Sequence, residues 1–316
     1  MLSRENLSVS LDCSGNALTT IPTDLATNVC APNQEKSEVS SSCTVSGSDL
    51  HGKEVTLQQL LRATREIQWM KKTDTRLAKS PTTTAQWSLE LEAADLPRSA
   101  ISFFVGCKNT KATRNGGNTE VSVCKVPVNV EARASSVGGN NAVTCAYGKE
   151  SNPQPLQVEM STEKNTETID CGTDGSLHPA TSTAEYCVAD STNLESCTTK
   201  AFVDIFPTFV TSWWTTEAKG ISAKLTTPAK DFPEAEQQFR PGCVPKQSAP
   251  SPDTNGLERL GDGDSAEQTG ATTSSCNVIV TLKTSNSTSL ASSTAQMAAV
   301  AGGAAALTGF LVGSFC

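Results

Sequence analysis

The chain has 316 residues, a length that accommodates about two domains. Hydrophobic residues make up 37% of it and aromatic residues 5%, which is lean for a globular core but too apolar for a wholly disordered protein. The formal net charge of −8 gives no indication of nucleic-acid binding.

Short segments with alternating apolar residues recur along the chain, separated by clusters of Ser, Thr, Asn, Gly and Pro. Strands are predicted at 7–11, 87–91, 121–123, 126–130, 156–160, 221–225 and 278–282. Two stretches, 55–62 and 201–206, are predicted to form short helices or turns. This pattern indicates an all-β fold of the β-sandwich type with short helical turns only.

Twelve cysteines, none arranged as C-x-x-C, are the most informative feature of the composition. The chain has only two histidines, His51 and His178, so the short Cys/His spacings of a zinc site are missing from the sequence. Wide spacing favours disulfides and an oxidising, secretory environment over buried thiols in a cytosolic protein. The first ten residues contain no apolar run of a signal peptide, so we expect the N-terminus to be truncated.

The two halves of the chain share features at a constant offset of 136 residues. The matching pairs are Pro97 and Pro233, Phe103 and Phe239, Gly106 and Gly242, and Cys107 and Cys243. This duplication predicts a first domain at 1–131, a linker at 132–139 and a second domain at 140–284. Residues 246–270, rich in Ser, Pro, Asp and Gly, are predicted to form a mobile insertion in the second domain.

The second predicted domain has six cysteines and the first has five. By register, the first domain lacks its first cysteine, which leaves Cys124 without a partner in that domain. Two explanations are open: the partner precedes Met1, or Cys124 is a free thiol that is reactive or bridges two chains.

The C-terminal region 285–316 has the order of a glycosylphosphatidylinositol (GPI) anchor signal. A polar Ser/Thr stretch precedes residues 297–316, which are apolar and carry no charge. The candidate attachment residues are Ser285, Asn286 and Ser287. The alternative is a transmembrane helix, which the Ala and Gly content disfavours. We therefore expect a protein anchored by lipid in the outer leaflet of the plasma membrane.

Several segments resemble the SRS (surface-antigen-related) superfamily of coccidian apicomplexan parasites, from about residue 7 to residue 282. They are 130–137, Tyr186-Cys187, Cys197 to Phe206, Trp213-Trp214, and Phe239 to Cys243. The resemblance implies two tandem disulfide-stapled Greek-key β-sandwich domains. It also implies the pairs Cys13–Cys107, Cys30–Cys43, Cys145–Cys276, Cys171–Cys243 and Cys187–Cys197, with Cys124 unpaired.

No catalytic, cofactor or metal motif is found in the sequence, so an enzyme is not expected. His51 and His178 lie in predicted loops and are expected to be solvated. The acidic group Asp262, Asp264 and Glu267 lacks the ligand spacing of an EF-hand, which favours a solvated loop. For Trp213 and Trp214, packing at the sandwich edge is favoured over a ligand platform.

Basic residues gather in the first domain, within 18 positions: Arg62, Arg65, Lys71, Lys72, Arg76 and Lys79. Residues 1–130 carry 14 basic and 13 acidic side chains, whereas residues from 134 onward carry 10 basic and 19 acidic ones. Clustered cations bind sulfated glycans electrostatically, although an ordinary solvated face has the same composition.

The leading hypothesis is a surface antigen and adhesin that binds host sulfated proteoglycans or other glycans and is recognised by host antibodies. The resemblance adds a homodimer through the first domain. The alternative is a structural coat or immune-decoy antigen without a specific ligand. N-glycosylation sequons occur at Asn6 and Asn286.

Overall fold

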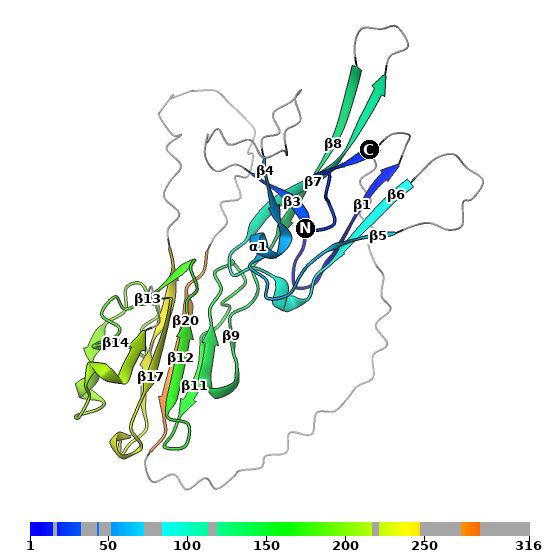
Figure 1. Cartoon of the computed structure of the whole chain (residues 1–316). Helices are drawn as coiled ribbons and strands as arrows, with labels where there is room; N and C mark the ends of the chain where they lie inside the picture. Colours follow the sequence, from blue (N-terminus) through cyan, green and yellow to red (C-terminus); the bar gives the residue numbers. More distant parts are fainter. Residues whose placement is uncertain are drawn as a thin grey trace, which may run out of the picture. The chain divides into compact units, whose positions relative to one another are not determined.

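The computed structural model describes residues 1–14, 18–32, 43, 52–72, 84–112, 119–216, 221–246 and 273–284. These residues are mostly β-strand (Figure 1). They fall into two compact units: Met1–Pro97 with Ile101–Glu131, and Arg98–Ala100 with the residues from Ala132 onward. No helix in the described ranges is long and apolar enough to cross a membrane.

The first unit contains two sheets. Their strand orders are β1 (Ser8–Ser14), β6 (Thr84–Glu90), β5 (Trp69–Lys72), and β2 (Leu18–Ile21), β7 (Ile101–Ala112), β3 (Asn28–Pro32), β4 (Gly52–Thr56), with β8 (Thr119–Val130) also paired to β7. Alternate residues of each strand point to one face, and the apolar ones meet in a common core that includes Leu11, Leu89, Phe103 and Val105. The α-helix α1 (Leu57–Leu61) adds two buried leucines to this core.

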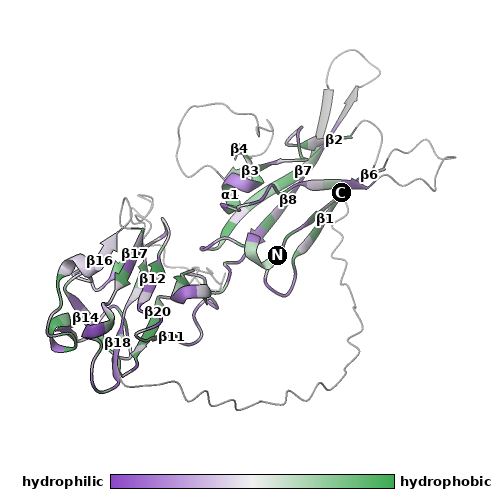
Figure 2. Ribbon diagram, turned by 60° about the horizontal axis from the view of Figure 1, so that its bottom comes forward, coloured by the Kyte–Doolittle hydropathy of each residue, from purple (hydrophilic) through white to green (hydrophobic). Residues whose placement is uncertain are grey.

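The second unit is also built from two sheets. Their strand orders are β16 (Trp214–Thr216), β17 (Ser222–Thr226), β12 (Thr166–Asp170), β10 (Ala142–Thr144), β9 (Ser136–Val137), and β13 (Gly175–His178), β19 (Gly242–Pro245), β20 (Cys276–Leu282), β18 (Gln237–Arg240), β14 (Glu185–Val188), β15 (Thr199–Ala201), with β11 (Leu156–Met160) also paired to β20. Side chains from both sheets, among them Ile169, Leu225, Phe239 and Val280, form one core. Figure 2 shows hydrophobic and hydrophilic stretches along the strands of both units.

The all-β expectation and the predicted strands are confirmed, and the predicted helical stretches are shorter than expected. The stretch 55–62 contains α1, which begins where Thr56 Oγ1 accepts a hydrogen bond from Gln59 N. The stretch 201–206 contains only the 3₁₀ helix η3 (Phe202–Asp204). The remaining 3₁₀ helices of the described residues are η1 (Ala93–Asp95), η2 (Gly139–Asn141), η4 (Thr211–Trp213) and η5 (Ala229–Asp231).

The expectation of a linker at 132–139 is wrong. These residues belong to the second unit, where Val137 of β9 pairs with Val143 of β10. Ser135 Oγ accepts a hydrogen bond from Ala146 N at 2.8 Å. Small polar residues resemble a linker in sequence, yet their backbone groups extend the sheet here. The predicted insertion 246–270 lies, beyond Lys246, outside the described residues.

The structure contains the five disulfides that the resemblance implies. The expectation that Cys124 is unpaired is wrong, because Cys124 is disulfide-bonded as well. Its partner lies outside the described residues. The sequence argument considered only the cysteines of one domain, and a disulfide is not restricted to residues that are near in sequence.

Candidate functional site

The basic segment of the first unit begins at the end of α1. Arg62 is exposed and closes the helix in the left-handed conformation, with φ 55°. Its backbone N–H donates to the carbonyl oxygens of Gln58 and Gln59. The guanidinium group of Arg62 therefore extends from a position that the helix end fixes.

Lys71 and Lys72 continue the basic segment on β5, the last strand in the order of its sheet. Both side chains are exposed. Lys71 stands opposite Trp87 of β6, with its ammonium group 5.7 Å from the centre of the Trp87 ring. Lys72 is opposite Gln86, and neighbouring residues of a strand point to opposite faces. The two lysines therefore belong to different faces of the sheet.

Arg65 holds part of the structure rather than standing free. Its Nε donates to Asp95 Oδ1 at 3.0 Å, and Asp95 is buried. Asp95 Oδ2 accepts in turn from Glu92 N, the residue at which η1 begins. The hydrogen bond to Asp95 raises the pKa of Arg65, so the guanidinium is fully charged and its charge is largely offset. Arg65 therefore contributes less to a basic surface than the sequence suggests.

The expected six-residue glycan-binding cluster is thus not one surface among the described residues. Arg62, Lys71 and Lys72 are its exposed members, and Arg76 and Lys79 lie outside the described residues. The anchor candidates Ser285, Asn286 and Ser287, the sequon at Asn286 and His51 also lie outside them. Asn6, the other glycosylation candidate, is exposed, and its Nδ2 donates to Met1 O at 3.1 Å.

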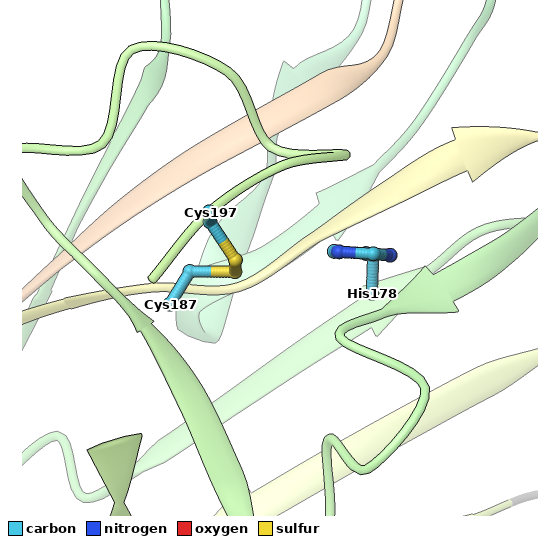
Figure 3. A group of neighbouring side chains, drawn as sticks. All are labelled: His178, Cys187 and Cys197. Atoms are coloured by element: carbon cyan, nitrogen blue, oxygen red, sulfur yellow. A yellow bond between two sulfur atoms is a disulfide. The ribbon is translucent and has the colours of Figure 1, made fainter. Parts of the chain in front are cut away.

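His178 is the last residue of β13 and is half-buried, which differs from the solvated position expected for it. Figure 3 shows it beside the Cys187–Cys197 disulfide. A ligand atom of each of the three residues lies within 4.8 Å of the others. Zinc binds thiolates, and the two sulfurs are consumed by the disulfide, so the oxidised group is not a zinc site. Burial lowers the pKa of His178.

The two neighbouring tryptophans divide between interior and surface. Trp214 is buried in the core of the second unit, as the packing interpretation requires. Trp213 is half-buried and meets Phe206 and Phe209 edge to face, with both ring centroids 5.5 Å away. Trp213 is thus the outer member of an aromatic cluster that reaches the surface.

Sequence reasoning missed one unusual residue, Glu167 of β12. Its side chain is fully buried, and neither carboxylate oxygen has a hydrogen-bond partner in the described part of the chain. Burial raises the pKa of Glu167 to about 8. The signal was available, because Glu167 alternates in phase with the apolar Ile169 and thus occupies the inward face of the strand.

Comparisons with known proteins agree with this architecture. A family model described as the SRS domain matches residues 1–130 and 141–282. Among solved structures, the bradyzoite-specific antigen BSR4 of Toxoplasma gondii matches with 43% identity and a TM-score of 0.71, over 90% of this chain and 88% of that one. The Plasmodium falciparum protein Pf12p matches with 9% identity and a TM-score of 0.27. A search of curated proteins finds no match.

Proposed function

Because this chain belongs to the SRS family of surface antigens, we propose that it is a lipid-anchored adhesin that binds sulfated glycans of host cells through its first unit. The observation that carries the glycan proposal is the exposed pair Lys71 and Lys72 on β5, with Arg62 nearby in sequence. Sulfate groups attract such cations, and the contact weakens as salt screens it.

The charge distribution supports the same assignment of roles. Residues 1–130 have a net charge of +1, and residues from 134 onward have −9. An acidic second unit repels polyanions, so glycan binding belongs to the first unit.

Heparin chromatography of the full chain tests the glycan proposal. We expect retention at low salt that is lost in the triple variant Arg62→Glu, Lys71→Glu, Lys72→Glu. The matched control Lys164→Glu, Lys224→Glu, Lys230→Glu makes the same charge change on exposed residues of the second unit and should elute within a few tens of millimolar salt of the wild type. Equal elution of the two variants would refute the assignment to the first unit.

The anchor proposal rests on the apolar run at 297–316 and the polar stretch before it. Treatment of intact cells with phosphatidylinositol-specific phospholipase C should release the protein. Retention of a protein whose anchor carries no lipid modification that blocks the enzyme would favour the membrane-spanning alternative.

A homodimer through the first unit is part of the proposal, since β5 pairs only with β6 among the described strands. The free edge of a strand offers backbone N–H and C=O groups to a second copy. A sedimentation equilibrium at twice the monomer mass would support this dimer.

A coat or immune-decoy role is the second candidate, and two observations favour it. Arg65 is occupied by Asp95, and Lys71 and Lys72 project from opposite faces of their strand. A glycan array without binding, together with strong recognition by host antibodies, would select this role.

A further inference from the structure

A small apolar surface projects from the second unit. Val210 is 51% exposed, and Phe209 and Trp213 are half-buried. Trp213 N donates to Val210 O at 3.0 Å, which closes the turn that brings the three side chains together. Phe209 stacks on the buried Phe202 at 4.9 Å between centroids, so the surface rests on the core. We refer to Phe209, Val210 and Trp213 as the apolar tip.

The apolar tip lies at the end of the second unit where β20 finishes. Residues 227–236 connect β17 to β18, and β18 begins opposite the end of β20, with Gln237 paired to Leu282. Lys283 Nζ lies 3.1 Å from Glu236 Oε2. Thr208 Oγ1, next to Phe209, donates to Asp231 Oδ1 of the connection at 2.6 Å. The tip is therefore held at the end from which the chain continues toward residue 285.

Val203 has the same exposure, 51%, at a different place on this unit. It follows Phe202, whose N–H donates to Ala184 O just before β14 begins. β14 runs antiparallel to β18, and β18 runs antiparallel to β20. The beginning of β14 therefore lies toward the beginning of β20, away from the end that holds the tip. Val203 is a matched control for Val210.

The sequence that follows β20 indicates what the apolar tip meets. The candidate attachment residues begin directly after Thr284, and Ser287 is at most about 10 Å further along the chain. A lipid attached there brings this end of the unit near a bilayer, and the glycan of the anchor leaves the protein free to approach. Trp and Phe favour the interface between membrane and water, where the ring meets apolar groups.

Charge decides which lipid fits. Acidic residues outnumber basic ones around this end of the unit; the acidic ones are Glu159, Glu163, Asp231, Glu234 and Glu236, and the basic ones are Lys164, Lys230 and Lys283. An anionic bilayer repels such a surface, whereas a zwitterionic one does not.

We propose that the apolar tip contacts the membrane to which the chain is anchored, with Phe209, Val210 and Trp213 among zwitterionic headgroups. This contact rests on the proposed anchor and extends it: the second unit stands on the bilayer with the end of β20 toward the lipid, instead of moving freely on its tether.

Tryptophan quenching by brominated lipid tests the contact. The full-length anchored protein is reconstituted into phosphatidylcholine vesicles with and without brominated phosphatidylcholine. We expect partial quenching that is lost in Trp213→Phe, which keeps an aromatic ring in the cluster. Val210→Glu should reduce the quenching several-fold, and Val203→Glu should leave it unchanged. Circular dichroism and the disulfide map establish that each variant is folded.

The outcomes separate the contact from the anchor. Quenching that is absent, or that persists in Trp213→Phe, overturns the contact even when phospholipase C releases the protein and the anchor stands. Equal loss in Val203→Glu and Val210→Glu also overturns it. Quenching that strengthens when anionic lipid is added contradicts the choice of lipid. Resistance to phospholipase C overturns the anchor, and the quenching then reports on the contact separately.

Discussion

Glu167 occupies an inward position of β12 that apolar residues otherwise fill. Leu225 of β17 is its partner across the sheet, and Trp214 of β16 is opposite Leu225 on the other side. Burial is the one cause that raises its pKa. Glu167 is therefore protonated in the folded protein at neutral pH, and its buried carboxyl group is a cost that the surrounding core offsets.

The pH dependence of stability should follow from this residue. The folded-state pKa is about 8 and the reference value is 4.5, so the folded state binds one more proton between these values. Stability is then greatest below pH 4.5 and falls as pH rises toward 8, by a few kcal/mol in all.

Glu167→Gln should remove this decline. Thermal unfolding measured from pH 5 to pH 8 should show a falling Tm for the wild type relative to Glu167→Gln. The control Glu163→Gln, at an exposed acidic position in the same unit, should follow the wild type. Parallel curves for the wild type and Glu167→Gln would contradict a raised pKa at this position.

At the scale of elements, the repeat found in the sequence has a direct counterpart in the strands. η1 and η5 are separated by the same 136 residues as the sequence matches, and Gly106 and Gly242 follow them in β7 and β19. A Cβ atom at Gly106 would lie 2.2 Å from Cys124 O, and one at Gly242 would lie 2.3 Å from Cys276 O. The repeated glycine thus reflects the same close approach of two strands in both units.

Gly242→Ala should therefore destabilise the second unit, because the carbonyl it meets belongs to a paired backbone that has little freedom to move. We expect a loss of about 1–3 kcal/mol or more, measured by chemical denaturation. Gly139→Ala is the matched control, since a Cβ there meets nothing within 4 Å. Similar stability of the two variants would show that the strands adjust.

The basic segment shows where element structure changes a prediction from sequence. Adjacent lysines in the sequence suggest one patch, but Lys71 and Lys72 alternate across β5. Arg65 is drawn to Asp95, which is distant in sequence and whose position only folding fixes. Of six cations in one short stretch, the three that are exposed and described thus have different surroundings.

At the scale of the whole molecule, disulfides compensate for a lean apolar interior. Cys145–Cys276 spans 131 residues, and Cys187–Cys197 spans 10. In the chain-entropy model these closures are worth about 5 and about 3 kcal/mol, respectively. The long closure is comparable to the net stability of a small domain.

Removing the long closure should therefore cost more. Cys145→Ala with Cys276→Ala should lower the midpoint of denaturant unfolding further than Cys187→Ala with Cys197→Ala. Both double variants remove two cysteines, so the comparison isolates the length of the closed loop. A larger loss in the second variant would show that local packing outweighs the entropy of the unfolded chain.

The sequence by itself determined the all-β class, the duplication, and the membership suggested by its cysteines and Trp-Trp pair, because these depend on local periodicity and on spacing along the chain. The tertiary structure decided that residues 132–139 join a sheet, that Cys124 is bonded, and that Glu167 is enclosed without a hydrogen-bond partner in the described residues. It also decided which cations remain exposed. Each of these depends on groups far apart in sequence, whose proximity is created only when the strands pack.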